Sequence, residues 1–227
     1  MFARLAPLAL AVLLLSPGTP AGAQASPAPT PATLSAGETK SVAQISATLN
    51  RRYPNPAAAE KAGYVRYTNE DDTGAISYAD REWNSTTQER PSQLWYDVNG
   101  RLLGADYSVL VATHPTPPSL FGIAPSRFFE ENAHVHYVVR NPDGSLTYSR
   151  AVGAKKYAAA GLDVQHPTAA GLVKVGAVDS PDRVATVFLF PHIWDVTIWV
   201  LPNPDGAFAD KNPNVTPAQT PSPSDMH

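Results

Sequence analysis

The stretch LWYDVNGRLLGADYSVLV, residues 94–111, decides the fold class of this chain. Its centre, Asn99-Gly100, lies between two runs that are rich in aromatic and aliphatic residues. Asn-Gly is the strongest short signal for a two-residue hairpin turn, because both turn residues take a positive φ. We therefore predict a β-hairpin whose strands cover residues 94–98 and 101–111.

Two more strand pairs are expected further along the chain. The sequence Asn-Pro-Asp-Gly at 141–144 is a turn sequence, and strand-forming residues flank it on both sides. Near the end of the chain, two apolar runs are joined around Pro191. The expected strands cover residues 133–140 and 145–149 in the first pair, and residues 184–190 and 196–201 in the second.

Four short helices are expected in addition to the strands. Ser35 and Glu38 have the spacing of a capping box, and Asn55-Pro56 matches an N-cap followed by proline at the first helical position. The expected helices cover residues 38–50, 56–62, 153–160 and 167–175. A long loop that can hold one helical turn is expected over residues 113–132. This pattern indicates an α+β fold, with an antiparallel sheet built from hairpins and short helices packed on one face.

The start of the chain matches an export signal. Arg4 precedes an apolar run at 5–15, Pro17-Gly18 interrupts it, and Ala21-Gly22-Ala23 supplies the small residues that a signal peptidase recognises. The apolar run is about half of the roughly 20 residues that a membrane-spanning helix needs. We therefore expect a cleaved signal peptide at 1–23, a secreted or periplasmic protein, and no membrane span after cleavage.

Composition divides the rest of the chain into three parts. Residues 24–36 are rich in Ala, Pro, Ser and Thr and are expected to form a linker, because they carry too little apolar surface to order themselves. A single α+β domain is expected over residues 37–210. Residues 211–227 have the same character as the linker and are expected to form a disordered tail.

Cysteine content and charge exclude several classes of protein. The chain has no cysteine, which excludes disulfides, thiol catalysis and thiolate metal sites. Its formal net charge is −3, and it contains no long run of Lys and Arg. Proteins that bind nucleic acid need such a basic surface, so no nucleic-acid partner is expected.

The sequence His134-Val135-His136 is a candidate metal site. Residues two apart in a strand point to the same face, so both imidazoles are expected side by side. Imidazole is a good ligand for zinc and other divalent metals, and His192 is the expected third ligand. Alternative third ligands are His166, Glu130, Glu131 and Asp106. Two histidines on a solvated face, or hydrogen-bonded in a polar pocket, produce the same pattern, and this alternative stays open.

Aromatic residues are concentrated in FLFPHIWD, residues 188–195, and continue to Trp199. Such residues form either core strands or the wall of a ligand pocket, and both interpretations stay open. The candidate ligand pocket consists of Trp95, Tyr107, Tyr137, Trp194, Asp195 and Trp199. No Gly-x-Ser-x-Gly sequence is present, so a serine hydrolase is not expected and catalytic residues are not assigned.

Two stretches resemble a family of bacterial exported hypothetical proteins. One is LWYDVNGRLLGADY at 94–107, and the other is WVLPNPDGAFADKNPNV at 199–215. The resemblance covers most of residues 55–215 and implies an exported domain of the same fold with no established activity. Members of that family carry two histidines where this chain has Ser77 and Thr197, which implies that this chain lacks that pair.

A fainter resemblance is to plant oil-body-associated proteins. It rests on residues 96–97, on residues 101–107, and on the His-x-His of 134–136 followed by a hairpin. This resemblance implies no catalytic mechanism for the chain.

Three functions follow from these observations. The leading hypothesis is an exported non-catalytic domain that binds a small or apolar ligand, or a protein partner. The first alternative is a metal-binding protein or metal-dependent enzyme built on His134 and His136. The second alternative is a hydrolase that uses a pair of carboxylates from Asp or Glu residues.

Overall fold

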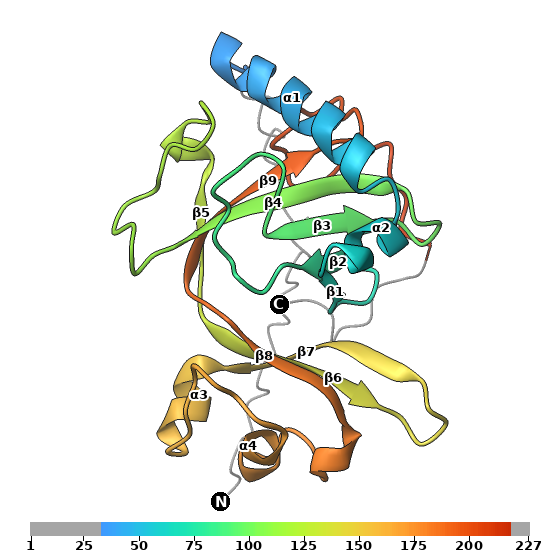
Figure 1. Ribbon diagram of the computed structural model, residues 1–227, viewed down its shortest axis with the longest axis vertical. Coiled ribbons are helices and arrows are strands. Elements are labelled where there is room, and N and C mark those ends of the chain that lie inside the picture. Colours follow the sequence, from blue (N-terminus) through green and yellow to red (C-terminus); the bar gives the residue numbers. More distant parts are fainter. Residues whose placement is uncertain (1–32, 219–227) are drawn as a thin grey trace, which may run out of the picture. The chain divides into compact units, whose positions relative to one another are not determined.

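A computed structural model describes residues 33–218 of the chain. They form two antiparallel sheets and a few short helices, which confirms the predicted α+β class (Figure 1). The expected signal peptide, residues 24–32 of the expected linker and residues 219–227 of the expected tail lie outside the described residues. None of the helices between residues 33 and 218 is long and apolar enough to span a lipid bilayer.

The larger sheet has six strands in the order β1-β2-β3-β4-β9-β5. Their bounds are Val65–Arg66 for β1, Ile76–Ala79 for β2, Gln93–Tyr96 for β3, Leu102–Leu110 for β4, Ile193–Trp199 for β9 and Phe129–Glu131 for β5. The hairpin predicted around Asn99-Gly100 is confirmed as β3 and β4. The predicted two-residue turn with two positive φ angles is wrong: the turn spans residues 97–101 and only Gly100 has a positive φ, of 78°. The Gly100 N–H donates to the Asp97 carbonyl at 2.9 Å, and a turn of this kind needs one left-handed residue at its end.

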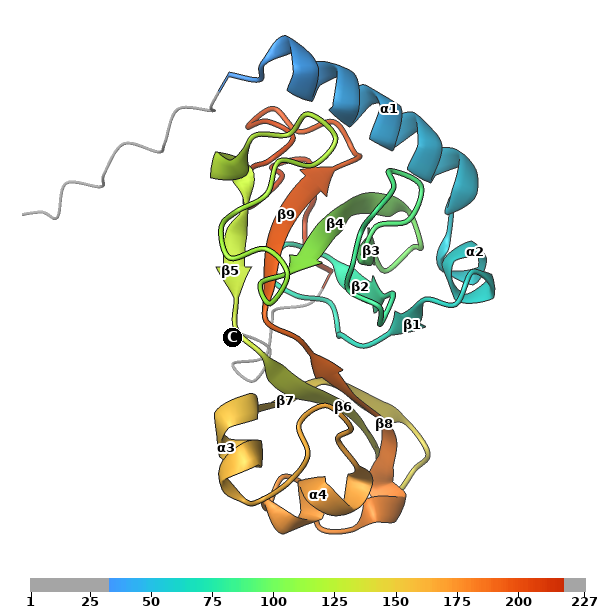
Figure 2. The same ribbon diagram turned by 60° about the vertical axis from the view of Figure 1, so that its left-hand side comes forward.

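Helices α1 (Ala36–Arg52) and α2 (Pro56–Lys61) pack against one face of the larger sheet (Figure 2). The capping box of Ser35 and Glu38 is present as predicted, and Asn55 caps α2. Ile45 and Leu49 project from α1 into a core that contains aromatic and aliphatic residues of β2, β3, β4 and β9. The main hydrophobic core therefore lies between α1 and the sheet.

The smaller sheet has three strands in the order β7-β6-β8. They are β6 (His134–Arg140), β7 (Leu146–Gly153) and β8 (Val184–Phe190), so the second predicted hairpin is confirmed. Helices α3 (Ala154–Ala159) and α4 (Ala169–Lys174) pack on one face of it through Tyr157 and Leu172. Each sheet thus has helices on one face, where the sequence predicted one such sheet.

The chain crosses between the two sheets twice. The first crossing is Asn132-Ala133, between β5 and β6, and the second is Pro191-His192, between β8 and β9. The expected last strand pair is therefore corrected: both strands exist, but β8 pairs with β6 and β9 pairs with β4 and β5. The second strand also begins earlier than expected, at Ile193.

The ordered part of the chain extends past the boundary predicted at residue 210. Asn212 is buried, and its side chain donates to the carbonyl of Pro202 at 3.2 Å. Val215 packs in a small cluster with Leu103 and Trp199. Residues 211–218 are therefore part of the fold, because Asn212 and Val215 pack against residues at the ends of β4 and β9.

Candidate functional site

Polar side chains of β4 and β9 lie on the face of the larger sheet that points away from α1. The strand register places Asp106 opposite Thr197 and Ser108 opposite Asp195. Thr197 donates to Asp106 at 2.9 Å, and Ser108 donates to Asp195 at 2.8 Å. Asp106 is only 4% exposed and Asp195 only 2% exposed. Alternation along the strands therefore produces a buried polar layer behind the hydrophobic face.

Burial is the main influence on the pKa values of the two carboxyl groups of this layer. Burial and the nearby Asp195 raise the pKa of Asp106 well above its usual range. Burial raises the pKa of Asp195 to about 7, although the hydrogen bond from Ser108 acts in the opposite direction. A carboxyl that catalyses hydrolysis must touch its substrate, whereas these two are enclosed by protein atoms. The pair therefore does not support the carboxylate hydrolase alternative.

The two histidines of β6 project from the same side of the strand, as predicted. Their ring centroids are 5.5 Å apart, His134 stacks on Phe190, and His136 stacks on Phe188. His136 is buried, and Tyr67 meets it edge-on with a centroid distance of 4.9 Å. Both imidazoles are thus part of an aromatic layer between the two sheets.

The third expected ligand, His192, forms a different contact. Its Nε2 lies 2.6 Å from Oε1 of Glu130, and both side chains are exposed. Within residues 33–218, no group of three or more His, Asp or Glu side chains is arranged to hold a metal ion. The metal site of His134, His136 and His192 stays a prediction for which the described residues supply no ligand set.

The six residues of the candidate ligand pocket do not form one pocket wall. Tyr107 and Trp194 belong to the core against α1, and Tyr137 belongs to the core of the smaller sheet. Trp95 and Trp199 meet edge-on in a third cluster, and Asp195 lies in the polar layer. The separation arises because neighbouring residues of a strand point to opposite faces, so an aromatic run in sequence is divided in space.

Trp83 occupies an unusual position in the loop between β2 and β3. Its φ is 51°, in the left-handed region that bulky residues rarely adopt. Its backbone N–H donates to the carbonyl of Asp80, whose carboxylate forms an ion pair with Arg90 at 2.6 Å. The ring is only 2% exposed and packs on Phe190 with a centroid distance of 4.3 Å. The loop therefore inserts Trp83 into the aromatic layer between the sheets.

The indole N–H of Trp83 differs from those of the other three tryptophans. Trp95 donates to Asp106 at 2.9 Å, Trp194 to the carbonyl of His114 at 2.9 Å, and Trp199 to the carbonyl of Ala209 at 2.6 Å. The buried indole nitrogen of Trp83 has no hydrogen-bond partner within residues 33–218. Buried polar groups are nearly always hydrogen-bonded, so this exception is a candidate binding group.

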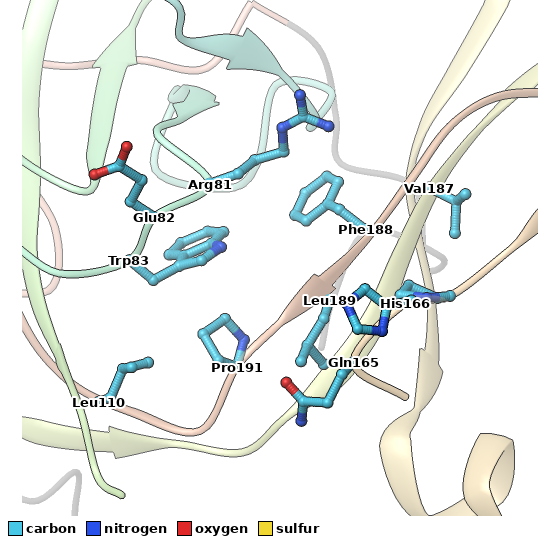
Figure 3. A pocket seen from close by; sticks show the side chains of 11 residues that line it. Arg81, Glu82, Trp83, Leu110, Gln165, His166, Val187, Phe188, Leu189 and Pro191 are labelled. Carbon is cyan, nitrogen blue, oxygen red and sulfur yellow. The ribbon is translucent and has the colours of Figure 1, made fainter. Parts of the chain in front are cut away.

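Trp83 lines a cavity of about 500 Å³, which we call the Trp83 cavity. Four segments form it: the loop after β2, the end of β4, the segment before α4, and β8 with the crossing that follows it (Figure 3). The lining residues are Arg81, Glu82, Trp83, Leu110, Gln165, His166, Pro167, Val187, Phe188, Leu189 and Pro191. Figure 3 shows the indole nitrogen on the side of the Trp83 ring that faces the other lining residues.

The rim of the Trp83 cavity carries polar side chains. Within residues 33–218, the side chains of Arg81, Glu82 and Gln165 make no hydrogen bond or ion pair. His166 lies 2.8 Å from Asp163 through its Nδ1, and this hydrogen bond lowers the pKa of the Asp163 carboxyl. The cavity thus combines an apolar wall with several hydrogen-bonding groups that are available to a ligand.

Sequence reasoning identified little of this site. The sequence places Phe188 in an aromatic run and offers His166 as an alternative metal ligand, but its motifs do not indicate Trp83. One signal was present: Trp83 is the single large apolar residue between Asp80 and Ser85. A tryptophan in such a polar turn is more often docked into a distant part of the fold than left in water.

Comparison of the chain with models of protein families, with curated proteins and with solved structures found no match. The two resemblances described above therefore stay predictions.

Proposed function

We propose that the chain is an exported, non-catalytic domain that binds a small, partly apolar molecule in the Trp83 cavity. The volume of about 500 Å³ suits this function, since pockets for small ligands measure roughly 300–1,000 Å³. The mixture of an apolar wall and a few polar groups is also typical of such pockets. Export is proposed on the residues of the expected signal peptide alone.

The single observation that carries the proposal is that Trp83 combines a left-handed backbone with a buried indole N–H that has no hydrogen-bond partner within residues 33–218. A buried N–H without an acceptor costs about 1–3 kcal/mol, and a left-handed backbone at a bulky residue costs a further 1–3 kcal/mol or so. A fold retains such costs where the surrounding structure enforces them, and these positions concentrate at ligand sites. An acceptor atom of a ligand would remove the first of the two costs.

The chemistry of the lining supports binding without catalysis. The residues that line the Trp83 cavity include no Ser, Thr, Cys, Lys or Tyr side chain, and the lining residues that could act as a nucleophile or base are Glu82 and His166, of which Glu82 has its carboxylate turned away from Trp83 in Figure 3. The two buried carboxyl groups with raised pKa values belong to the polar layer and do not line the cavity. No nucleophile hydrogen-bonded to a base lines the cavity within residues 33–218, which supports binding as the proposed function.

The test uses the four indole N–H groups as internal reporters. Purified protein with 15N-labelled tryptophan is titrated with phenylacetate, phenylacetamide and benzyl alcohol, and the indole signals are followed by NMR. We expect one signal to move saturably downfield as its proton gains an acceptor, while the signals of Trp95, Trp194 and Trp199 stay in place. The variant Trp83→Phe identifies the moving signal, and the three unchanged signals show that this variant is folded.

Two results would count against the proposal. If no indole signal moves with any probe up to millimolar concentration, the cavity does not bind molecules of this class. If all four signals move together and without saturation, the probes act on the whole surface. Saturable movement of the Trp83 signal alone is the result that supports the function.

A further inference from the structure

Two charged side chains lie on the rim of the Trp83 cavity, those of Arg81 and Glu82. Arg81 lies on the rim, is exposed, and forms no ion pair within the described part of the chain. Glu82, the lining residue with a negative charge, is drawn in Figure 3 with its carboxylate turned away from the ring of Trp83 and from His166. Figure 3 draws the guanidinium of Arg81 beyond Phe188 and also turned away from the ring of Trp83, so the rim carries one unpaired cation and one unpaired anion, and the longer side chain of Arg81 has the greater reach towards a ligand.

Hydrogen-bond donors also predominate around the cavity. The indole N–H of Trp83 can only donate, and the guanidinium of Arg81 carries five N–H donors and no acceptor. Gln165, which also lines the cavity, can add a further donor from its amide group. A ligand that satisfies this set needs oxygen atoms that accept several hydrogen bonds, and a carboxylate provides two such atoms with a negative charge.

The remaining wall is apolar. Leu110, Val187, Leu189 and Pro191 are half-buried, and Phe188 is buried beside them. An apolar body that covers these side chains gains from removal of its surface from water. The indole nitrogen of Trp83 is itself shielded from solvent, so binding includes a small side-chain shift of the half-buried lining residues, as is common at binding sites.

From this arrangement we infer that the ligand of the Trp83 cavity is a carboxylate with an apolar body, such as an aryl-substituted or medium-chain alkanoic acid. The carboxylate accepts from Trp83 and Arg81, and the apolar body lies against β8 and Pro191. This inference rests on the proposed function, because it assigns the chemistry of the ligand that the same cavity binds.

The experiment compares three probes that share one apolar body. Phenylacetate, phenylacetamide and phenethylamine differ in the group at the end of the same side chain, which is an anion, a neutral amide and a cation. Dissociation constants are measured from the Trp83 indole signal. Because charge-assisted hydrogen bonds are stronger than neutral ones, we expect phenylacetate to bind about tenfold more tightly than phenylacetamide, and phenethylamine to bind most weakly.

Substitutions test whether Arg81 causes the preference for a negatively charged ligand. In Arg81→Gln, the preference for phenylacetate over phenylacetamide should fall to less than about threefold, while binding of the amide changes little. The matched control is Arg150→Gln, which removes an exposed arginine of β7 that does not line the cavity and should leave all three constants unchanged. Glu82→Gln should strengthen binding of phenylacetate slightly or leave it unchanged.

The outcomes separate this inference from the function on which it rests. If the amide or the amine binds as tightly as phenylacetate, the cavity is a binding site but the carboxylate assignment is overturned. If phenylacetate is preferred equally by the wild type and by Arg81→Gln, the role of Arg81 is overturned. If none of the three probes moves the Trp83 signal in folded protein, both the inference and the proposed function fail.

Discussion

The buried carboxyl group of Asp195 leads to a prediction about stability and pH. Its pKa is raised from 3.8 to about 7 in the folded protein, chiefly by burial. The folded state therefore binds more protons than the unfolded state between these two values. The free energy of unfolding should fall as the pH rises from about 4 to about 7, and this contribution should be constant above that range.

The magnitude follows from the size of the shift. A pKa change from 3.8 to about 7 corresponds to about 4 kcal/mol, at about 1.4 kcal/mol for each pK unit. Asp195→Asn removes this titration but loses roughly one neutral hydrogen bond of the acid, which is worth about 1 kcal/mol. We therefore expect the variant to be more stable than the wild type by about 2–3 kcal/mol at pH 8, and no more stable than the wild type at pH 4.

The assay is urea unfolding followed by tryptophan fluorescence at pH 4, 5, 6, 7 and 8. The difference in the free energy of unfolding between variant and wild type at each pH isolates the contribution of Asp195, because most other titrating groups are common to both proteins. The neighbouring Asp106 is the exception, since the charge of Asp195 raises its pKa and the substitution removes that effect. A difference in stability that does not change between pH 4 and pH 8 would refute the reasoning.

Two further predictions concern packing and metal. At Gly104 an added Cβ would lie 2.7 Å from the backbone carbonyl oxygen of Ile198, so Gly104→Ala should destabilise the protein by more than about 2 kcal/mol. Gly153, where nothing lies within 4 Å of an added Cβ, is the matched control and should tolerate Ala in the same unfolding assay. For the metal hypothesis, we expect the melting temperature of the purified protein to be the same with and without EDTA, and elemental analysis to find less than stoichiometric metal; a chelator-dependent drop in melting temperature would restore that hypothesis.

Sequence reasoning succeeded where the signal was local. The hairpin around Asn99-Gly100 and the capping box of Ser35 and Glu38 depend on a few neighbouring residues, and both are present. Strands β1, β2 and β5 cannot be predicted from their own residues, because they contain two to four residues, too few to display an alternation. Their formation depends on partner strands that are distant in the sequence.

The candidate site was predictable only in part for the same reason. Alternation along β6 correctly placed His134 and His136 on one side of the strand. It could not show that Tyr67 and Trp83, from two loops elsewhere in the chain, are packed into the layer with them and with Phe188. The indole N–H without a partner is a property of the assembled fold and has no counterpart in the sequence.

The two crossings between the sheets have a mechanical consequence. Each is only two residues long, so four residues hold all the covalent connections through which one sheet could tilt against the other. Glu130, beside the first crossing, contacts His192 in the second at 2.6 Å. Because one wall of the Trp83 cavity belongs to β8 and another to the loop after β2, a change of angle at these hinges would alter the width of the cavity. The contact between the exposed side chains of Glu130 and His192 would then resist part of that change of angle.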